Sequence, residues 1–238
     1  MTARKALACI WLAAISLGVA LLWGEALSGP AVGTFDQITV RRINVVEPDG
    51  KPRMIVSDRA EFPGLFWGGR EYRHHNRDTG GFLFFNDDGD EDGGMTFSNR
   101  REGGHYTAES GIDFDQFKQD QTVGLDYAEQ DGVRAAGLKV WDRPDQSLFP
   151  VIELSDQAAH ASTDAEKAAI RQKMKDLVVS YGHFGQRLFA GKEGHDAVVR
   201  LADGQGRPRL VMRVGPFGEA SVDFLDGGGK VVKHITGT

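Results

Sequence analysis

The chain has 238 residues, a formal net charge of -6 and one cysteine, Cys9, which lies in an apolar segment near the N-terminus. The rest of the chain has no thiol, which excludes disulfides, cysteine–zinc sites and cysteine nucleophiles from it. With 40% hydrophobic residues and many more glycines (31) than prolines (8), the composition is typical of a folded domain of short strands and tight turns.

The N-terminal segment combines basic residues with a long apolar run. Arg4 and Lys5 precede an uncharged run over residues 6–23. Such a run is just long enough to span a bilayer as a helix, and the same order of features is typical of a secretory signal peptide. We favour an uncleaved anchor, because the run is long for a signal peptide and Trp11 and Trp23 suit a membrane interface. Residues 1–24 are therefore predicted to be a signal anchor or, if cleaved, a signal peptide.

A linker rich in glycine and proline follows at residues 25–34. From residue 35 to residue 238 strand signals dominate, beginning with β-branched residues at 38–40 and 43–46 and continuing at 54–56. Under either interpretation of the N-terminus, the basic residues stay in the cytoplasm and this β-rich domain lies outside it. A cleaved product would be periplasmic or secreted.

Asp-Gly pairs, which favour the positive φ of hairpin turns, recur along the domain. They stand at Asp49-Gly50, Asp88-Gly89, Asp131-Gly132, Asp203-Gly204 and Asp226-Gly227. Two stretches, 46–56 and 201–212, share the order of apolar strand, Asp-Gly, Pro-Arg and apolar strand, but the spacing of the pairs has no fixed period. We therefore expect a mainly β fold of antiparallel hairpins or meanders, sandwich-like or barrel-like, and not a solenoid.

Alternation of apolar and polar residues supports strands around Ile112 to Asp115, at 123–127, at 209–214 and at 221–224. We expect the apolar side of each strand to be buried and the polar side to be wet. One amphipathic surface helix is predicted near residues 164–179, where Thr163 and Glu166 form a capping box.

Several short stretches resemble a family of uncharacterised exported bacterial proteins. They are Ile43 to Gly50, Phe62-Pro63-Gly64, Phe84 to Gly89, Phe114-Asp115-Gln116 with Gln119-Asp120-Gln121, and Asp142-Arg143-Pro144. The resemblance covers roughly residues 35–150. It implies a bacterial source and an extracytoplasmic domain, and it implies no activity.

The sharpest candidate site is an acidic loop whose oxygen ligands alternate: Asn86, Asp88, Asp90 and Asp92, with Gly89 for the turn. Calcium prefers six to eight oxygens on a flexible loop, so a calcium site is one hypothesis and an acidic hairpin turn is the other. Position 12 of a loop that starts at Asn86 is Phe97, where an EF-hand needs a glutamate, so this is not an EF-hand.

Residues 82–132 hold 13 acidic and 3 basic side chains, and this excess of negative charge argues against a nucleic-acid partner. Asp113 and Asp115 would share one strand face, but we interpret them as the wet side of that strand and assign no catalytic residue. Adjacent His74 and His75 would point to opposite sides of a strand and would not share a metal. The aromatic residues in the loop at 62–81 are expected to be buried.

The sequence thus predicts a membrane-anchored envelope protein with a non-enzymatic binding or scaffolding domain. A protein or glycan of the envelope is its expected partner, and no cofactor is expected apart from the calcium hypothesis. The alternative is a hydrolase or calcium-dependent module that uses carboxylates of residues 82–132.

Overall fold

A computed structural model describes residues 33–75, 77–182 and 184–237. The predicted anchor or signal peptide and most of the predicted linker lie outside these residues. Residues 33–40 form neither helix nor strand, so the strand predicted at 38–40 is wrong. The β-rich part of the chain, Arg41–Thr238, is one compact unit. None of the helices in the described residues is long and apolar enough to cross a membrane.

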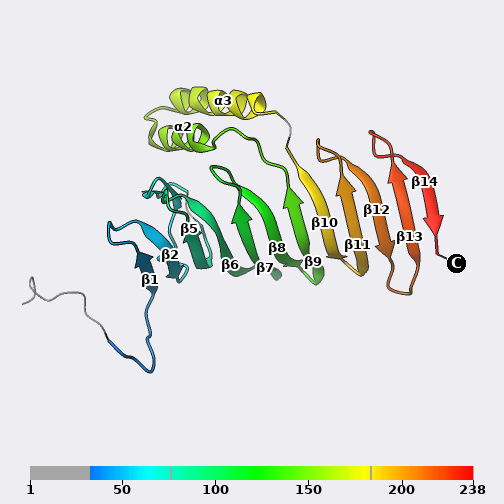
Figure 1. Cartoon of the computed structure of the whole chain (residues 1–238), viewed down its shortest axis with the longest axis horizontal. Helices are drawn as coiled ribbons and strands as arrows, with labels where there is room; N and C mark the ends of the chain where they lie inside the picture. Colours follow the sequence, from blue (N-terminus) through cyan, green and yellow to red (C-terminus); the bar gives the residue numbers. More distant parts are fainter. Residues whose placement is uncertain (1–32, 76, 183, 238) are drawn as a thin grey trace, which may run out of the picture. The chain divides into compact units, whose positions relative to one another are not determined.

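Twelve strands form one antiparallel sheet in which each strand pairs with the strands next to it in the series (Figure 1). The order is β1-β2-β5-β6-β7-β8-β9-β10-β11-β12-β13-β14, so β1 and β14 are the outer strands of the sheet within the described residues. The predicted antiparallel meander is confirmed, but its described strands form one open layer in place of the sandwich-like or barrel-like arrangement. The strands are β1 Arg42–Val46, β2 Pro52–Ser57, β5 Gly80–Phe85, β6 Glu91–Glu102, β7 His105–Asp115, β8 Gln121–Gln130, β9 Val133–Trp141, β10 Gln186–Glu193, β11 Asp196–Ala202, β12 Pro208–Val214, β13 Ala220–Leu225 and β14 Val231–Thr236.

The five Asp-Gly pairs lie in hairpin turns, as predicted. They join β1 to β2, β5 to β6, β8 to β9, β11 to β12 and β13 to β14. Gly50, Gly89 and Gly132 have the positive φ that these turns need, whereas in the last two turns Gly206 and Gly229 take it instead. The similar stretches at 46–56 and 201–212 both form hairpins whose register shifts beside the turn.

The two faces of the sheet differ in composition. One face, called the apolar face below, carries two rows of paired residues that cross all twelve strands. The first row is Val45, Met54, Phe84, Gly93, Phe114, Val123, Val140, Leu188, Leu201, Leu210, Phe224 and Lys233. The second row is Ile43, Val56, Phe82, Met95, Ile112, Leu125, Leu138, Ala190, Val199, Met212, Val222 and Ile235.

The opposite face, called the cavity face, combines polar and glycine positions with buried apolar residues such as Ile55 and Leu83, and covering elements lie over β5–β7 of it. A short hairpin, β3 Leu65–Trp67 and β4 Arg70–Tyr72, interrupts the segment predicted to be a loop. Phe66 packs edge-on against Phe85 of β5, at 4.9 Å between ring centroids, in a buried cluster that also contains Ile55, Phe62 and Leu83. Burial of Phe66 and Tyr72 confirms the prediction for these aromatic residues.

Two helices, α2 Phe149–His160 and α3 Asp164–Ser180, connect β9 to β10 and lie beside one another at one end of the strands (Figure 1). The helix predicted at 164–179 is confirmed as α3: Thr163 Oγ1 accepts a hydrogen bond from the Glu166 amide at 3.1 Å. The second half of the capping box differs slightly, because Glu166 accepts from the amide of Ser162. Helix α2, which begins with Phe149-Pro150, is not predicted by the sequence pattern.

Candidate functional site

A cavity of about 510 Å³ lies between the cavity face of β5–β7 and the elements that cover it. Its apolar wall comes from β3 and the start of α2, including Phe66, Trp67 and Ile152. The sheet side is acidic. The carboxylates that line the cavity are Glu91, Asp113, Asp115 and Asp120. The structure therefore brings together four acidic residues from β6, β7 and the β7–β8 turn under an apolar cover.

Asp113 and Asp115 lie two residues apart on β7 and both point to the covered side of the sheet. Burial raises the pKa of Asp115 to about 8, and the negative charges of Glu91 and Asp120 add to the rise. Burial, followed by the charge of Glu91, raises the pKa of Asp113 to about 6. At pH 7 Asp115 therefore holds a proton while Asp113 is mostly ionised.

Glu91 is balanced by one cation. Arg77 Nη2 lies 2.8 Å from Glu91 Oε2, and both side chains are largely buried. Burial raises the pKa of Glu91 in spite of the opposing charge of Arg77. Asp115 lacks such a partner: its Oδ1 is buried and accepts no hydrogen bond from any described residue. One buried acceptor thus stands free at the acidic side of the cavity.

His74 and His75 also line the cavity, and they do not act as a pair. His74 contacts α2, with Nε2 3.2 Å from the Ser155 hydroxyl and Nδ1 3.0 Å from an Asp156 oxygen without hydrogen-bond geometry. Burial, followed by the charge of Arg77, lowers the pKa of His75. A neutral His75 can accept or donate a hydrogen bond within the cavity.

Asp156 anchors the cover of the cavity. Its carboxylate lies 3.1 Å from Arg70 Nη2 and 3.5 Å from His160 Nδ1, in addition to the contact with His74. Arg70 belongs to β4, so Asp156 joins α2 to the β3–β4 hairpin. Trp67 stacks on Phe149 at 5.7 Å between ring centroids, which adds an apolar contact between the same two elements.

The β7–β8 turn fixes the other side of the cover. The carbonyl of Lys118 accepts a hydrogen bond from the Leu148 amide at 2.9 Å, just before α2. Gln119, which is buried, donates through Nε2 to the carbonyl of Gln146 at 2.8 Å. The turn that carries Asp120 into the cavity thereby also positions the start of α2.

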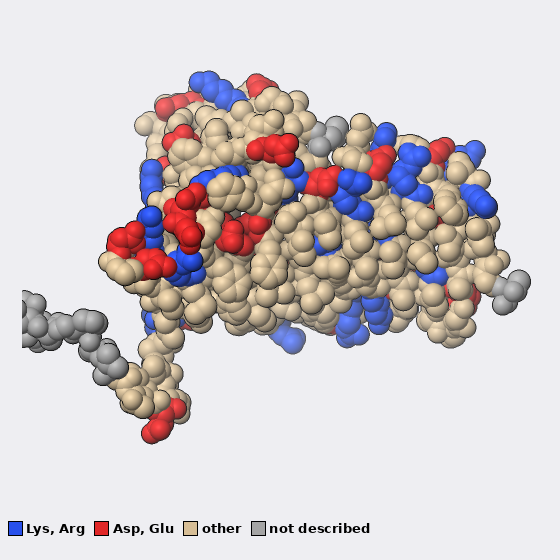
Figure 2. Space-filling view, viewed as in Figure 1, with Lys and Arg blue, Asp and Glu red and all other residues tan. Residues whose placement is uncertain are grey.

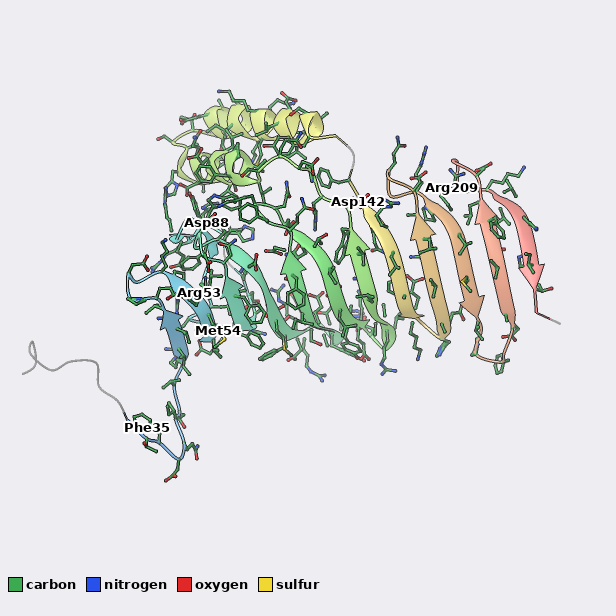
Figure 3. All side chains as sticks on the ribbon, viewed as in Figure 1. Phe35, Arg53, Met54, Asp88, Asp142 and Arg209 are labelled. Atoms are coloured by element: carbon green, nitrogen blue, oxygen red, sulfur yellow. The ribbon has the colours of Figure 1, made fainter. Side chains whose placement is uncertain are left out.

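The predicted calcium ligands are arranged around a lysine. Lys118 Nζ lies 2.6 Å from Asp88 Oδ2 and 2.5 Å from Asp90 Oδ2. Asn86 Oδ1 accepts hydrogen bonds from the amides of Asp88 and Asp90, as in an ordinary turn. Figure 3 shows Asp88 at the turn end of the sheet, on the side where α2 and α3 lie. Asp92 lies at the start of β6.

Lys118 supplies a positive charge to the loop. Hydrogen bonds to Asp88 and Asp90 raise the pKa of Lys118, although partial burial acts in the opposite direction. In the part of the chain that the structure describes, no group of three or more His, Cys, Asp or Glu side chains has an arrangement that could hold a metal ion. The calcium hypothesis stays a prediction, and Lys118 contacts two of its four ligands.

The sequence pattern predicts that Asp113 and Asp115 share one strand face on the wet side of β7. The structure reverses this: Phe114 is 52% exposed, and the two aspartates line the covered cavity. The contributions of Glu91 and Arg77 to the site are not predicted by the sequence pattern. The concentration of acidic residues in 82–132 was a signal for the site, but nothing local indicated which of them would meet.

Comparisons of the chain with protein-family models, with curated proteins and with solved structures found no match. The geometry of the cavity is therefore the basis for the functional argument.

Proposed function

We propose that this chain is a membrane-anchored protein of the bacterial cell envelope, whose β-rich domain lies outside the cytoplasm and binds a ligand without converting it. The anchor is the apolar run at residues 6–23 behind Arg4 and Lys5. The stretches that resemble exported bacterial proteins support the same location. The chain carries none of the common nucleophile or phosphate-binding motifs that would favour an enzyme.

The cavity at β5–β7 fits a small organic cation best. Its acidic side offers the carboxylates of Asp113, Asp115 and Asp120, whereas its opposite wall is apolar and aromatic. An ammonium group would satisfy the free Oδ1 of Asp115 and neutralise the crowded negative charge. Phe66 and Trp67 line the opposite wall and can contact the hydrocarbon part of the ligand. A lysine side chain of an envelope protein or an amino sugar of a glycan carries such a group.

The observation that carries this proposal is the raised pKa of Asp115, to about 8, in a cavity with three further carboxylates. A cation that binds beside Asp115 favours its ionised form, so binding at pH 7 should release a proton. An uncharged ligand of the same shape should bind more weakly and release none.

The test is calorimetry of the full chain with hexylammonium, with hexanol and hexanoate as matched neutral and anionic probes. We expect saturable binding of hexylammonium alone, with an enthalpy that depends on the ionisation enthalpy of the buffer. Asp113→Asn and Asp115→Asn should each weaken binding at least tenfold. Glu109→Gln is the control, because Glu109 lies on the same face of β7 as the two aspartates, but it is exposed and stands further toward the N-terminal end of that strand. Equal binding of the three probes, or a loss with Glu109→Gln as large as with Asp115→Asn, would contradict the proposal.

A second candidate, a hydrolase, is favoured by one observation: the pKa values of Asp113, about 6, and Asp115, about 8, lie on either side of neutral pH. General acid–base catalysis needs one protonated and one ionised group under the same conditions. In this case amide or glycoside probes would be turned over with a maximum rate between about pH 6 and 8, the two pKa values of the pair. Asp113→Asn and Asp115→Asn would each abolish turnover, whereas a binding domain gives no turnover at any pH.

A further inference from the structure

Among the residues that the structure describes, none covers the apolar face of the sheet. Leu125 is 57% exposed and Met212 is 47% exposed, and both lie in the second row of that face. Exposed large apolar residues occur in both rows from β1 to β14: Ile43, Val45, Val56, Met95, Phe114, Leu138, Leu201, Phe224 and Ile235. A patch of this extent on a folded domain marks an interaction surface.

The composition of this face is that of a sandwich core. The two rows contain one charged residue, Lys233, at the edge strand β14, and no tryptophan or tyrosine. Phe82, Phe84 and Phe114 form an aromatic ladder, with Phe84 stacked on Phe114. In Figure 2 the charged side chains gather near the ends of β10–β14, whereas the middle of these strands is almost free of charge. Side chains of this kind interdigitate with a second sheet face.

The area of the face matches what a stable dimer needs. Twelve strands spaced about 4.8 Å apart give a width of about 55 Å, and five residues along each strand give a height of about 17 Å. Each copy would then cover about 900 Å² of its partner, or about 1,800 Å² in total, which lies in the range of specific protein–protein interfaces. A hollow of about 500 Å³ over β11–β14, lined partly by Val199, Met212 and Ile235, could receive side chains of the opposite copy.

We infer that two copies of this chain pack apolar face against apolar face and form a two-layer sandwich. A second copy brings a surface of the same width, with the same two apolar rows and without opposing charges. The cavity lies on the other face, so this inference does not depend on the proposed ligand.

Full overlap of two such faces places the middle strands of one copy over the middle strands of the other. This holds whether the twofold axis runs along the strands or across them. Leu125 on β8 and Leu138 on β9 then lie close to their own counterparts. Stacked sheets lie about 10 Å apart, which a short bis-maleimide spans.

The experiment uses the full chain with Cys9→Ser and one new cysteine at a time, treated with that bis-maleimide in membranes and after purification. Leu125→Cys and Leu138→Cys should give a covalent dimer. Val211→Cys, on the cavity face, is the control and should give none. Adding Met212→Glu to Leu125→Cys should reduce the dimer at least tenfold, whereas adding Val211→Glu should leave it, provided that both variants keep the melting temperature of the parent.

Two results would overturn the inference. In one, Leu125→Cys and Leu138→Cys react fully with the reagent and the chain stays monomeric. In the other, both cysteines are protected from the reagent until detergent is added, which would mean that lipid covers the face.

Discussion

Replacing Lys118 by methionine should lower the free energy of unfolding by about 2–3 kcal/mol, because it removes the cation that balances a buried carboxylate. Asp90 is 1% exposed, and its Oδ2 lies 2.5 Å from Lys118 Nζ. Its other oxygen accepts a hydrogen bond from the amide of Gly68 at 2.7 Å. In the variant Asp90 keeps one partner, and its charge stays inside the protein.

The magnitude follows from the burial of the two partners. Removing one member of a fully buried ion pair costs about 3–5 kcal/mol. The Lys118 side chain is 30% exposed, so water can reach part of the space that it leaves, and we reduce the cost to about 2–3 kcal/mol. The contact with Asp88 adds little, because that carboxylate is mostly exposed. Lys118 has a φ of 59°. Methionine and lysine tolerate this φ equally, so the backbone strain is the same in the variant and the parent and does not affect the difference in stability.

Urea unfolding of the parent and the variant at pH 7 measures this loss. Lys118→Arg is the charge-preserving control and should recover much of the stability. Asp90→Asn should cost less in the Lys118→Met background than in the parent, because the amide carries no charge to balance. A loss below about 0.5 kcal/mol for Lys118→Met, as is usual for a surface substitution, would refute the reasoning.

Four further outcomes are expected. The raised pKa of Asp115 means that the folded state binds a proton more tightly than the unfolded state. The free energy of unfolding should therefore fall as the pH rises from about 4 to about 8. Urea titrations at several pH values measure this fall, and Asp115→Asn should make it smaller. Ile55→Ala, at a position 1% exposed, should cost about 2–5 kcal/mol in the same assay, whereas Val179→Ala on α3, at 69% exposed, should cost less than about 1 kcal/mol; equal losses would contradict the burial of Ile55. Asp156→Ala should speed hydrogen exchange in α2 while the exchange of β11–β13 is unchanged. Millimolar calcium should raise the melting temperature if the acidic loop binds it, and an unchanged value would end the calcium hypothesis.

Local sequence rules predicted the strands and turns well because these elements depend on neighbouring residues. The pair Asp131-Gly132 forms a two-residue hairpin, with both φ values positive, as the composition of the turn requires. The capping box at Thr163 likewise marked the start of α3. Helix α2 was missed because its amphipathic stripe is short and begins at Phe149-Pro150, although proline is favoured in the first turn of a helix.

The side of the sheet that is covered could not be predicted from alternation. Alternation at residues 112–115 shows that the two faces differ, but the cover comes from β3–β4 and α2, far away in the chain. Small residues on the cavity face let this sheet come close to what covers it and to adjacent strands; a Cβ at Gly94, for example, would lie 2.7 Å from Leu83. The site depends on the same long-range contacts. The sequence therefore lists its carboxylates but does not predict which of them line one cavity.

The order of the strands has a consequence for how the domain forms during synthesis. From β5 to β9 and from β10 to β14, each new strand finds its partner in the strand made just before it, so only short loops have to close. Such a chain can grow its structure from the N-terminal side by successive hairpins while the ribosome is still extending it. The step that interrupts this growth is the passage through α2 and α3, after which β10 has to return to β9.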